Sequence, residues 1–205
     1  VLGAEILFNV GHTNKLDTFE NNVVMIDAFD NISFDQVLPK CIKKFNGKTI
    51  SLITDSQHLH EVDHVKQFLE ENNICVKIGK GKGQLNDGQV FGCEFYPAIE
   101  TKDEVDGNLF LGQSNFHAAG IALSTKKPTF VLDPYFNEIR DVTEFAQKLE
   151  RKATLSIYKA AEGQVFGIIV GLKEGQFAIL TALKFKKELE DVGKTVQLFA
   201  IADIT

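Results

Sequence analysis

Cys93 stands between a glycine and a glutamate in the stretch GQVFGCEFYPAI, residues 88–99, and it is one of three widely separated cysteines. Such a cysteine can be a small buried side chain, a free thiol or a ligand to a metal centre. No C-x-x-C pair occurs, which excludes the usual zinc and local iron–sulfur spacings. An odd number of distant cysteines also argues against a disulfide framework, so we expect a reducing, cytoplasmic setting.

The other side chains that could do chemistry gather in polar clusters. Each cluster follows a short apolar segment, and ligands of open parallel sheets bind beyond the carboxyl ends of the strands. Each also has a simpler explanation: Gly112, Ser114 and Asn115 could form only a turn and a helix N-cap. The clusters are GHTN at 11–14, TDSQHLH at 54–60, GQSNFH at 112–117, DPY at 133–135 and GLKEGQ at 171–176.

Several standard signatures are missing or weak. His60 and His64 have the spacing of a metal-binding pair, but His64 lies among charged residues on a face that we expect to be exposed. The stretch GKGKGQ, residues 79–84, lacks the spacing of a phosphate-binding loop and is followed by no predicted helix. No G-x-S-x-G occurs, so a nucleophile elbow is unsupported.

Short runs rich in Val, Ile and Phe alternate with segments of helical period along the chain. Apolar strands separated by helices are typical of a parallel sheet covered on both faces, so we predict an α/β fold. Ser33 is expected to cap the first helix and Pro39 to kink or break it. Strands are predicted at 5–10, 23–27, 48–54, 74–79, 108–112, 128–133, 165–171 and 194–201, and helices at 33–45, 60–73, 115–125, 142–161 and 175–193.

The order of strand, helix and strand occurs at 48–79 and again at 165–201, which suggests several like-built α/β units with parallel sheets. The first and last units look incomplete. The pattern places boundaries between these units near Gly47 and around Ala161.

Composition and charge exclude some partners. With 22 Lys and Arg against 28 Asp and Glu, the formal net charge is −6. Phosphate binding needs concentrated Lys and Arg, so we expect no nucleic-acid partner. No apolar run approaches the roughly 18 residues of a membrane span, and no signal peptide is visible, so we expect no membrane partner.

Three motifs occur in order: G-Q-V-x-G-C at 88–93, F-H-x-x-G-I-A at 116–122 and D-P-Y at 133–135. Together with the stretches 54–81 and 166–177, they resemble the archaeal diphthamide-biosynthesis enzymes, the 2-(3-amino-3-carboxypropyl)histidine synthase family. The resemblance runs through nearly the whole chain. It implies three similar α/β domains that each donate one cysteine to a central [4Fe–4S] cluster, in a protein that pairs as a homodimer. On this chain the resemblance implies a remnant of the first domain at 1–46, the second domain carrying Cys93 at 47–150 and the start of the third at 151–205.

The resemblance also implies the reaction. Three thiolates leave one iron of the cluster open, and S-adenosylmethionine is held there. The reduced cluster cleaves the bond from sulfur to the methionine γ-carbon. The resulting 3-amino-3-carboxypropyl radical adds to a histidine of translation elongation factor 2, which is the first step of diphthamide biosynthesis.

Within the resemblance, Cys93 matches the middle-domain cluster cysteine, while Cys41 and Cys75 match no ligand motif and are expected to be packing residues. The other two cluster cysteines would precede Val1 and follow Thr205. The chain as given would then be a truncated, inactive enzyme; the alternative is a divergent short relative. Catalytic roles are expected for His117, Asp133 and Gln176, and S-adenosylmethionine contacts for Gly112, Gln113, His117, Asp133, Lys173 and Gln176, with His12, Gln57 and His58 nearby.

Two other hypotheses stay open. Quinolinate synthase also has three similar domains and three separated cluster cysteines, although the F-H and D-P-Y contexts fit it less well. The third hypothesis is a non-catalytic α/β module whose crevice holds a nucleotide-like ligand or a protein partner.

Overall fold

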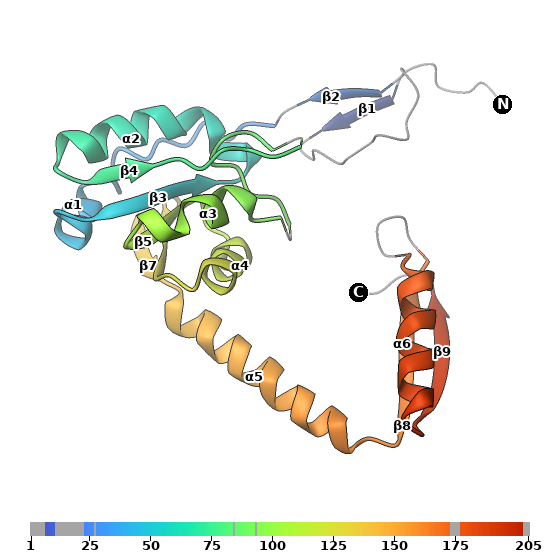
Figure 1. Ribbon diagram of the computed structural model, residues 1–205. Coiled ribbons are helices and arrows are strands. Elements are labelled where there is room, and N and C mark those ends of the chain that lie inside the picture. The colour runs from blue at the N-terminus through green and yellow to red at the C-terminus, as the bar shows by residue number, and fades with distance from the viewer. Residues whose placement is uncertain are drawn as a thin grey trace. The chain divides into compact units, whose positions relative to one another are not determined.

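The computed structural model describes residues 7–10, 23–26, 28–83, 85–92, 94–172 and 177–202 (Figure 1). These residues form an α/β fold whose paired strands are mostly parallel, which confirms the predicted fold class. The chain divides into two compact units, Val1–Glu150 and Arg151–Thr205.

The first unit is built around a five-stranded sheet with the strand order β4-β3-β5-β6-β7. The first four strands in that order are parallel, and β7 runs antiparallel to β6. Strands β5 and β6 are buried along their whole length, as expected for parallel strands covered on both faces. The strands are β3 Thr49–Thr54, β4 Cys75–Lys77, β5 Gly107–Leu111, β6 Thr129–Asp133 and β7 Glu138–Asp141.

Helices cover both faces of this sheet. Alternate residues of a strand point to opposite faces, so Leu52 and Leu109 pack with α1 and α2, whereas Ile53 and Phe110 pack with α3 and α4. Figure 1 shows α2 on one face of the sheet and α3 and α4 on the other. The helical elements are α1 Pro39–Phe45, η1 Ser56–Glu61, α2 Val62–Glu71, α3 Tyr96–Thr101, η2 Lys102–Glu104, α4 Asn115–Thr125 and α5 Thr143–Glu162.

Helix α1 begins later than predicted, because Pro39 starts it instead of kinking it. Proline suits the first turn of a helix, where its missing N–H would have no intrahelical partner. Ser33 does not cap this helix; its Oγ accepts a hydrogen bond from the backbone N–H of Asp35 at 3.1 Å in the preceding turn. The helix start and the Ser33 cap predicted at residue 33 were therefore wrong. Of the two outcomes expected at Pro39, the segment breaks there, with a turn at residues 35–38 before the helix.

Helix α1 packs in the same core as the five-stranded sheet. Phe34, Leu38, Cys41 and Phe45 belong to the cluster that contains Ile50 of β3 and the inner side chains of α2. The end of the predicted first domain, residues 1–46, thus contributes to the core of the second. The division into three domains otherwise stays a prediction.

The two described cysteines differ sharply in their surroundings. Cys41 is fully buried, as predicted for a packing residue, and burial raises the pKa of its thiol to about 12. Cys75 is exposed at the start of the edge strand β4, so its prediction as a packing residue was wrong. An edge strand has one side open to solvent, which the apolar run around Cys75 did not reveal.

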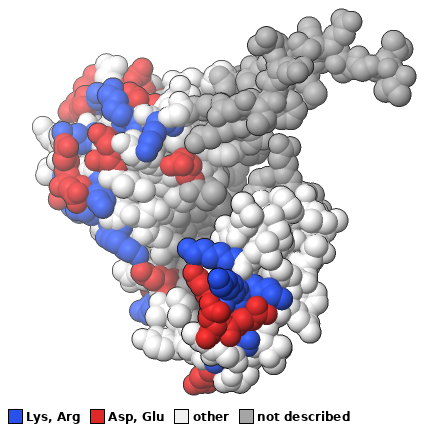
Figure 2. All heavy atoms as spheres, turned by 45° about the vertical axis from the view of Figure 1, so that its right-hand side comes forward, with Lys and Arg blue, Asp and Glu red and all other residues white. Residues whose placement is uncertain are grey.

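Each of the remaining strand pairs is a parallel ribbon. β8 Val165–Gly171 pairs with β9 Thr195–Ile201, and α6 Ile179–Asp191 joins them in the predicted order of strand, helix and strand. β1 Leu7–Val10 pairs with β2 Val23–Ile26. On the face shown in Figure 2, Lys and Arg lie interspersed with Asp and Glu. Within the described part of the chain, no helix is both long enough and apolar enough to cross a membrane.

Candidate active site

Three of the predicted polar clusters meet at one edge of the five-stranded sheet. The last residues of the parallel strands are in register, with Thr54 beside Leu111 and Leu111 beside Leu132. The loops that follow these strands therefore leave the sheet side by side. We call this region the carboxyl edge; it comprises residues 54–60, 112–117 and 133–136. It carries six of the predicted site residues, Gln57, His58, Gly112, Gln113, His117 and Asp133.

The segment that leads to Cys93 is fastened to the same edge. Thr54 donates its backbone N–H to the carbonyl of Gly88 at 3.0 Å, and Val90 donates its N–H to the carbonyl of Thr54 at 2.8 Å. Val90 is fully buried beside β3. Cys93 itself lies outside the described residues, as do His12, Lys173 and Gln176.

Beyond Cys93, the chain is anchored to helix α4. Phe91 donates its backbone N–H to the carbonyl of Glu94 at 3.0 Å, so the two residues that flank Gly92–Cys93 are paired. Phe95 then packs on Gly120, where a Cβ would lie only 2.1 Å from the phenyl Cζ. The glycine of the F-H-x-x-G motif thus makes room for the aromatic ring two residues after Cys93.

His117 is held in a defined orientation at the start of α4. Ser114 caps this helix, since its Oγ accepts the backbone N–H of His117 at 3.3 Å. The same Oγ lies 2.9 Å from the imidazole Nδ1, and the imidazole stacks on Phe110 with 5.7 Å between ring centroids. The simpler explanation of Ser114 as an N-cap is therefore correct, and the cap also orients an imidazole that can bind or move a proton.

Asp133 uses both carboxylate oxygens within the protein. The side chain is fully buried, and its Oδ1 accepts the backbone N–H groups of Tyr135 at 3.0 Å and Phe136 at 3.1 Å. Its Oδ2 accepts a hydrogen bond from Arg140 at 3.4 Å. In this arrangement the carboxylate shapes the D-P-Y loop.

Arg140, on β7, is a residue of the site that sequence reasoning missed. Its Nε donates to Asn115 Oδ1 at 2.9 Å and its Nη2 donates to the carbonyl of Gln113 at 3.1 Å. Its Nη1 donates to the carboxylate of Glu138. A usable signal existed, because the chain has only two arginines and this one follows the D-P-Y motif closely.

A second group missed by sequence reasoning joins Tyr135 to Asp30. The Tyr135 hydroxyl donates to the Asp30 carboxylate, whose other oxygen accepts the backbone N–H of Ile32 at 3.0 Å. Burial, together with this hydrogen bond, raises the pKa of Tyr135 to about 12. The hydrogen bond from Tyr135 lowers the pKa of Asp30. Asp30 also donates its backbone N–H to the carbonyl of Gln57 at 3.0 Å, which ties residues 28–33 to the carboxyl edge.

His58 is buried beside Phe34 and Tyr135. Its ring meets those of Phe34 and Tyr135 edge-on, with centroid distances of 5.3 Å and 6.3 Å. Burial lowers the pKa of His58, and its Nδ1 has no hydrogen-bond partner among the described residues. Gly112 lies close by with φ +134°, and a Cβ there would meet His58 Cδ2 at 3.5 Å.

Other candidate binding features are accounted for by internal contacts. His64 pairs with Asp35 at 2.7 Å instead of sharing a metal with His60. The N–H groups of Lys80 and Gly81 in the glycine-rich loop bind the carboxylates of Glu100 at 3.1 Å and Asp87 at 2.8 Å, respectively. Among the described residues, no group of three or more His, Cys, Asp or Glu side chains could hold a metal ion.

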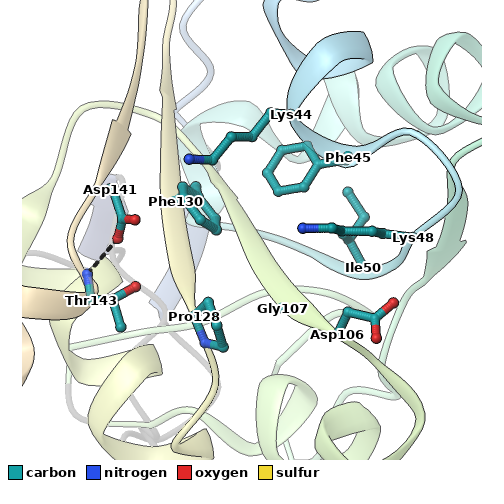
Figure 3. Close-up of a pocket in the computed structure, with 10 residues that line it drawn as sticks. All are labelled: Lys44, Phe45, Lys48, Ile50, Asp106, Gly107, Pro128, Phe130, Asp141 and Thr143. Atoms are coloured by element: carbon teal, nitrogen blue, oxygen red, sulfur yellow. Dashed lines mark hydrogen bonds between the residues drawn. The ribbon is translucent and has the colours of Figure 1, made fainter.

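A hollow of about 410 Å³ lies at the opposite, amino-terminal edge of the sheet (Figure 3). The carboxylates of its two aspartates accept backbone hydrogen bonds. Asp106 accepts the N–H of Thr49 at 2.8 Å, and Asp141 accepts the N–H of Thr143 at 2.9 Å. Lys44 lies 4.4 Å from the ring centroid of Phe130. Both aspartates and Lys44 are thus engaged by contacts within the protein. Its lining residues are Lys44, Phe45, Lys48, Ile50, Asp106, Gly107, Pro128, Phe130, Asp141 and Thr143.

The chain is similar along its length to proteins of diphthamide synthesis. The family model for diphthamide synthesis proteins matches residues 1–205. The 2-(3-amino-3-carboxypropyl)histidine synthase of Pyrococcus horikoshii is 30% identical over 207 residues, covering 100% of this chain and 59% of the relative. Subunit 1 of the same enzyme from Saccharomyces cerevisiae is 26% identical over 194 residues, covering 92% of this chain and 45% of the relative.

The fold is also similar to a solved structure. The crystal structure of Dph2 from Pyrococcus horikoshii with a 4Fe–4S cluster matches with a TM-score of 0.84 and 30% sequence identity, covering 98% of this chain and 59% of that chain. The chain therefore spans less than two thirds of the length of these relatives. With the family model matched over all of residues 1–205, this chain belongs to the diphthamide synthesis protein family.

Proposed function

We propose that this chain is part of a 2-(3-amino-3-carboxypropyl)histidine synthase and carries the middle cluster cysteine. The proposed reaction transfers the 3-amino-3-carboxypropyl group of S-adenosylmethionine to a histidine of translation elongation factor 2. The observation that carries the proposal is the anchoring of the chain on both sides of Cys93, to the carboxyl edge before it and to α4 after it. Val90 holds one side to β3, and Phe95 holds the other side to α4.

Cys93 is the proposed ligand of a [4Fe–4S] cluster. Cys41 has a raised pKa of about 12 in the apolar core, so it offers no thiolate near neutral pH. Cys75 pairs with Thr49 at the amino end of β3, at the other edge of the sheet. Cys93 is thus the cysteine whose neighbours in the chain lie at the carboxyl edge, and thiolate is the usual ligand of such clusters.

The family resemblance assigns the other two cluster thiolates to segments outside residues 1–205. When bound, the cluster supplies the electron that cleaves S-adenosylmethionine. We propose that residues 1–46, 47–150 and 151–205 belong to three successive domains, with α1 packed onto the second. A homodimer, a cytoplasmic setting and docking of elongation factor 2 at the carboxyl edge complete the proposal.

The residues of the carboxyl edge have distinct proposed roles. His117, oriented by Ser114, provides a hydrogen bond or proton to the substrate. Asp133 acts by shaping the D-P-Y loop, because its oxygens are engaged by the protein. S-adenosylmethionine contacts are proposed for Gly112, Gln113, Gln57 and His58, together with His12, Lys173 and Gln176 from outside the described residues.

Anaerobic purification of the complete protein tests the proposal. We expect the wild type and Cys75→Ala to bind iron and sulfide and to absorb visible light, and Cys93→Ala to lose most of this absorbance. The wild type should also transfer the aminocarboxypropyl group to elongation factor 2. Full iron content in Cys93→Ala would overturn the ligand assignment. Formation of quinolinate, or binding of ligand by a colourless wild type, would instead favour one of the two other hypotheses.

A further inference from the structure

We propose that Arg140 is a positioning residue, which fixes the Gln113–Asn115 backbone in the geometry that S-adenosylmethionine binding needs. The inference rests on the proposed function and deepens it, because it names a residue that acts on the ligand through the loop after β5. Arg140 comes from β7, a strand that runs antiparallel to its neighbour β6.

The guanidinium group joins two loops of the carboxyl edge. Toward the loop after β5, it donates to Asn115 Oδ1 at 2.9 Å and to the carbonyl of Gln113 at 3.1 Å. Toward the loop after β6, it donates to the buried Oδ2 of Asp133 at 3.4 Å. A fourth hydrogen bond goes to Glu138 on its own strand.

These hydrogen bonds fit a clamp, by which we mean a side chain that holds the two loops together, better than they fit an anion-binding site. Arginine has five N–H donors in a rigid plane, and four of them are committed here to protein acceptors. Only 28% of the side chain is exposed. An arginine that bound a substrate carboxylate directly would need a pair of donors aimed at the ligand.

The clamped loop has few other fixed points. Gly112 donates its N–H to the carbonyl of Leu132 at 3.1 Å, and Ser114 caps α4. Between them, the carbonyl of Gln113 is held by Arg140 alone among the described contacts. Releasing the guanidinium would free the backbone of Gln113 and leave the carboxylate of Asp133 without its cationic partner. Misplacement of a binding group by about 1 Å can cost on the order of a hundredfold in rate.

Lysine cannot replace this arginine fully. Its single ammonium group sits on a flexible stem and lacks the planar fork that reaches several acceptors at once. A lysine at position 140 keeps a positive charge near Asp133 but cannot hold Asn115 and Gln113 together. Comparing Arg140→Lys with Arg140→Ala therefore separates the effect of the positive charge from the effect of the hydrogen bonds to Asn115 and Gln113.

The test uses the complete, cluster-loaded protein and measures KM and kcat for S-adenosylmethionine, with iron content and the unfolding midpoint measured alongside. For Arg140→Ala we expect KM to rise about 10- to 100-fold with iron per chain unchanged, and for Arg140→Lys a smaller rise. Arg151→Ala, at an exposed position on α5, is the matched control and should match the wild type.

Asn115→Ala removes one acceptor of Arg140 without disturbing the buried Asp133. This variant therefore tests the role of Arg140 even if Arg140→Ala folds poorly. We expect it to raise KM by several-fold. An unchanged KM in Asn115→Ala, or in a well-folded Arg140→Ala, would overturn the role of Arg140. A wild type that neither binds nor turns over S-adenosylmethionine would refute the proposed function itself, which is a distinguishable result.

Discussion

Gly120 offers a quantitative test of how the segment after Cys93 is held. A Cβ at this position would lie 2.1 Å from Phe95 Cζ, 2.7 Å from Cε1 and 2.9 Å from Cε2. Gly120→Ala therefore forces the phenyl ring away from the core that it shares with Ala98 and Ala118. The ring cannot stay where it is.

Two effects oppose each other in Gly120→Ala. Alanine favours the helix over glycine by about 1 kcal/mol. Overpacking a core costs about 1–3 kcal/mol, and a clash with three ring atoms belongs in the upper half of that range. We expect a net loss of about 1–2 kcal/mol, which lowers the unfolding midpoint of a chain of this size by roughly 2–4 °C for each kcal/mol.

The sign of the effect should reverse when the ring is absent. In a Phe95→Ala background the clash disappears, so Gly120→Ala should stabilise the protein by about 1 kcal/mol through helix propensity alone. Urea unfolding of the wild type, both single variants and the double variant gives a coupling energy of about 2–3 kcal/mol. If Gly120→Ala stabilises both backgrounds equally, Phe95 does not pack on α4 as described.

Two further predictions concern single side chains, Tyr135 and the two described cysteines. Tyr135→Phe should cost about 1 kcal/mol near neutral pH, because it removes a partly exposed hydrogen bond to a carboxylate. The wild type should lose stability as pH falls through the lowered pKa of Asp30, below 3.8, and as pH rises from 10.0 toward the Tyr135 pKa of about 12. Unfolding midpoints between pH 2.5 and 11 should vary less in Tyr135→Phe, and equal profiles would contradict the assignment. Separately, iodoacetamide at pH 8 should label Cys75 in the folded protein and should label Cys41 only after urea is added. The reason is that Cys75 is exposed, whereas Cys41 is buried and has a raised pKa. Equal labelling rates of the two cysteines by peptide mass spectrometry would contradict this.

The parts of the fold that could be predicted from sequence are those where apolar residues cluster in a recognisable run. The strands β3, β5 and β6 are buried along nearly their whole length because both faces are covered, and their Ile, Leu, Val and Phe residues show it in the sequence. Parallel pairing then brings the clusters 54–60, 112–117 and 133–135 to one edge, so this gathering of polar loops was predictable as well.

The rest depends on contacts that leave little trace in local sequence. Helix α3 has six residues and β7 has four, too few for a period to stand out. The role of Arg140 depends on the register of a hairpin, with Arg140 opposite Val131. Tyr135 and Asp30 are 105 residues apart, and only the folded chain brings them together.

The two outer strands of the five-stranded sheet determine how another polypeptide can approach it. β4 has only three residues and β7 has four, with the sequence Glu-Ile-Arg-Asp. Both edge strands are therefore short, and β7 is strongly charged. Such edge strands resist the addition of a further strand from another chain. Under the proposed function, the protein substrate would therefore contact this unit through its loops and not by adding a strand to its sheet.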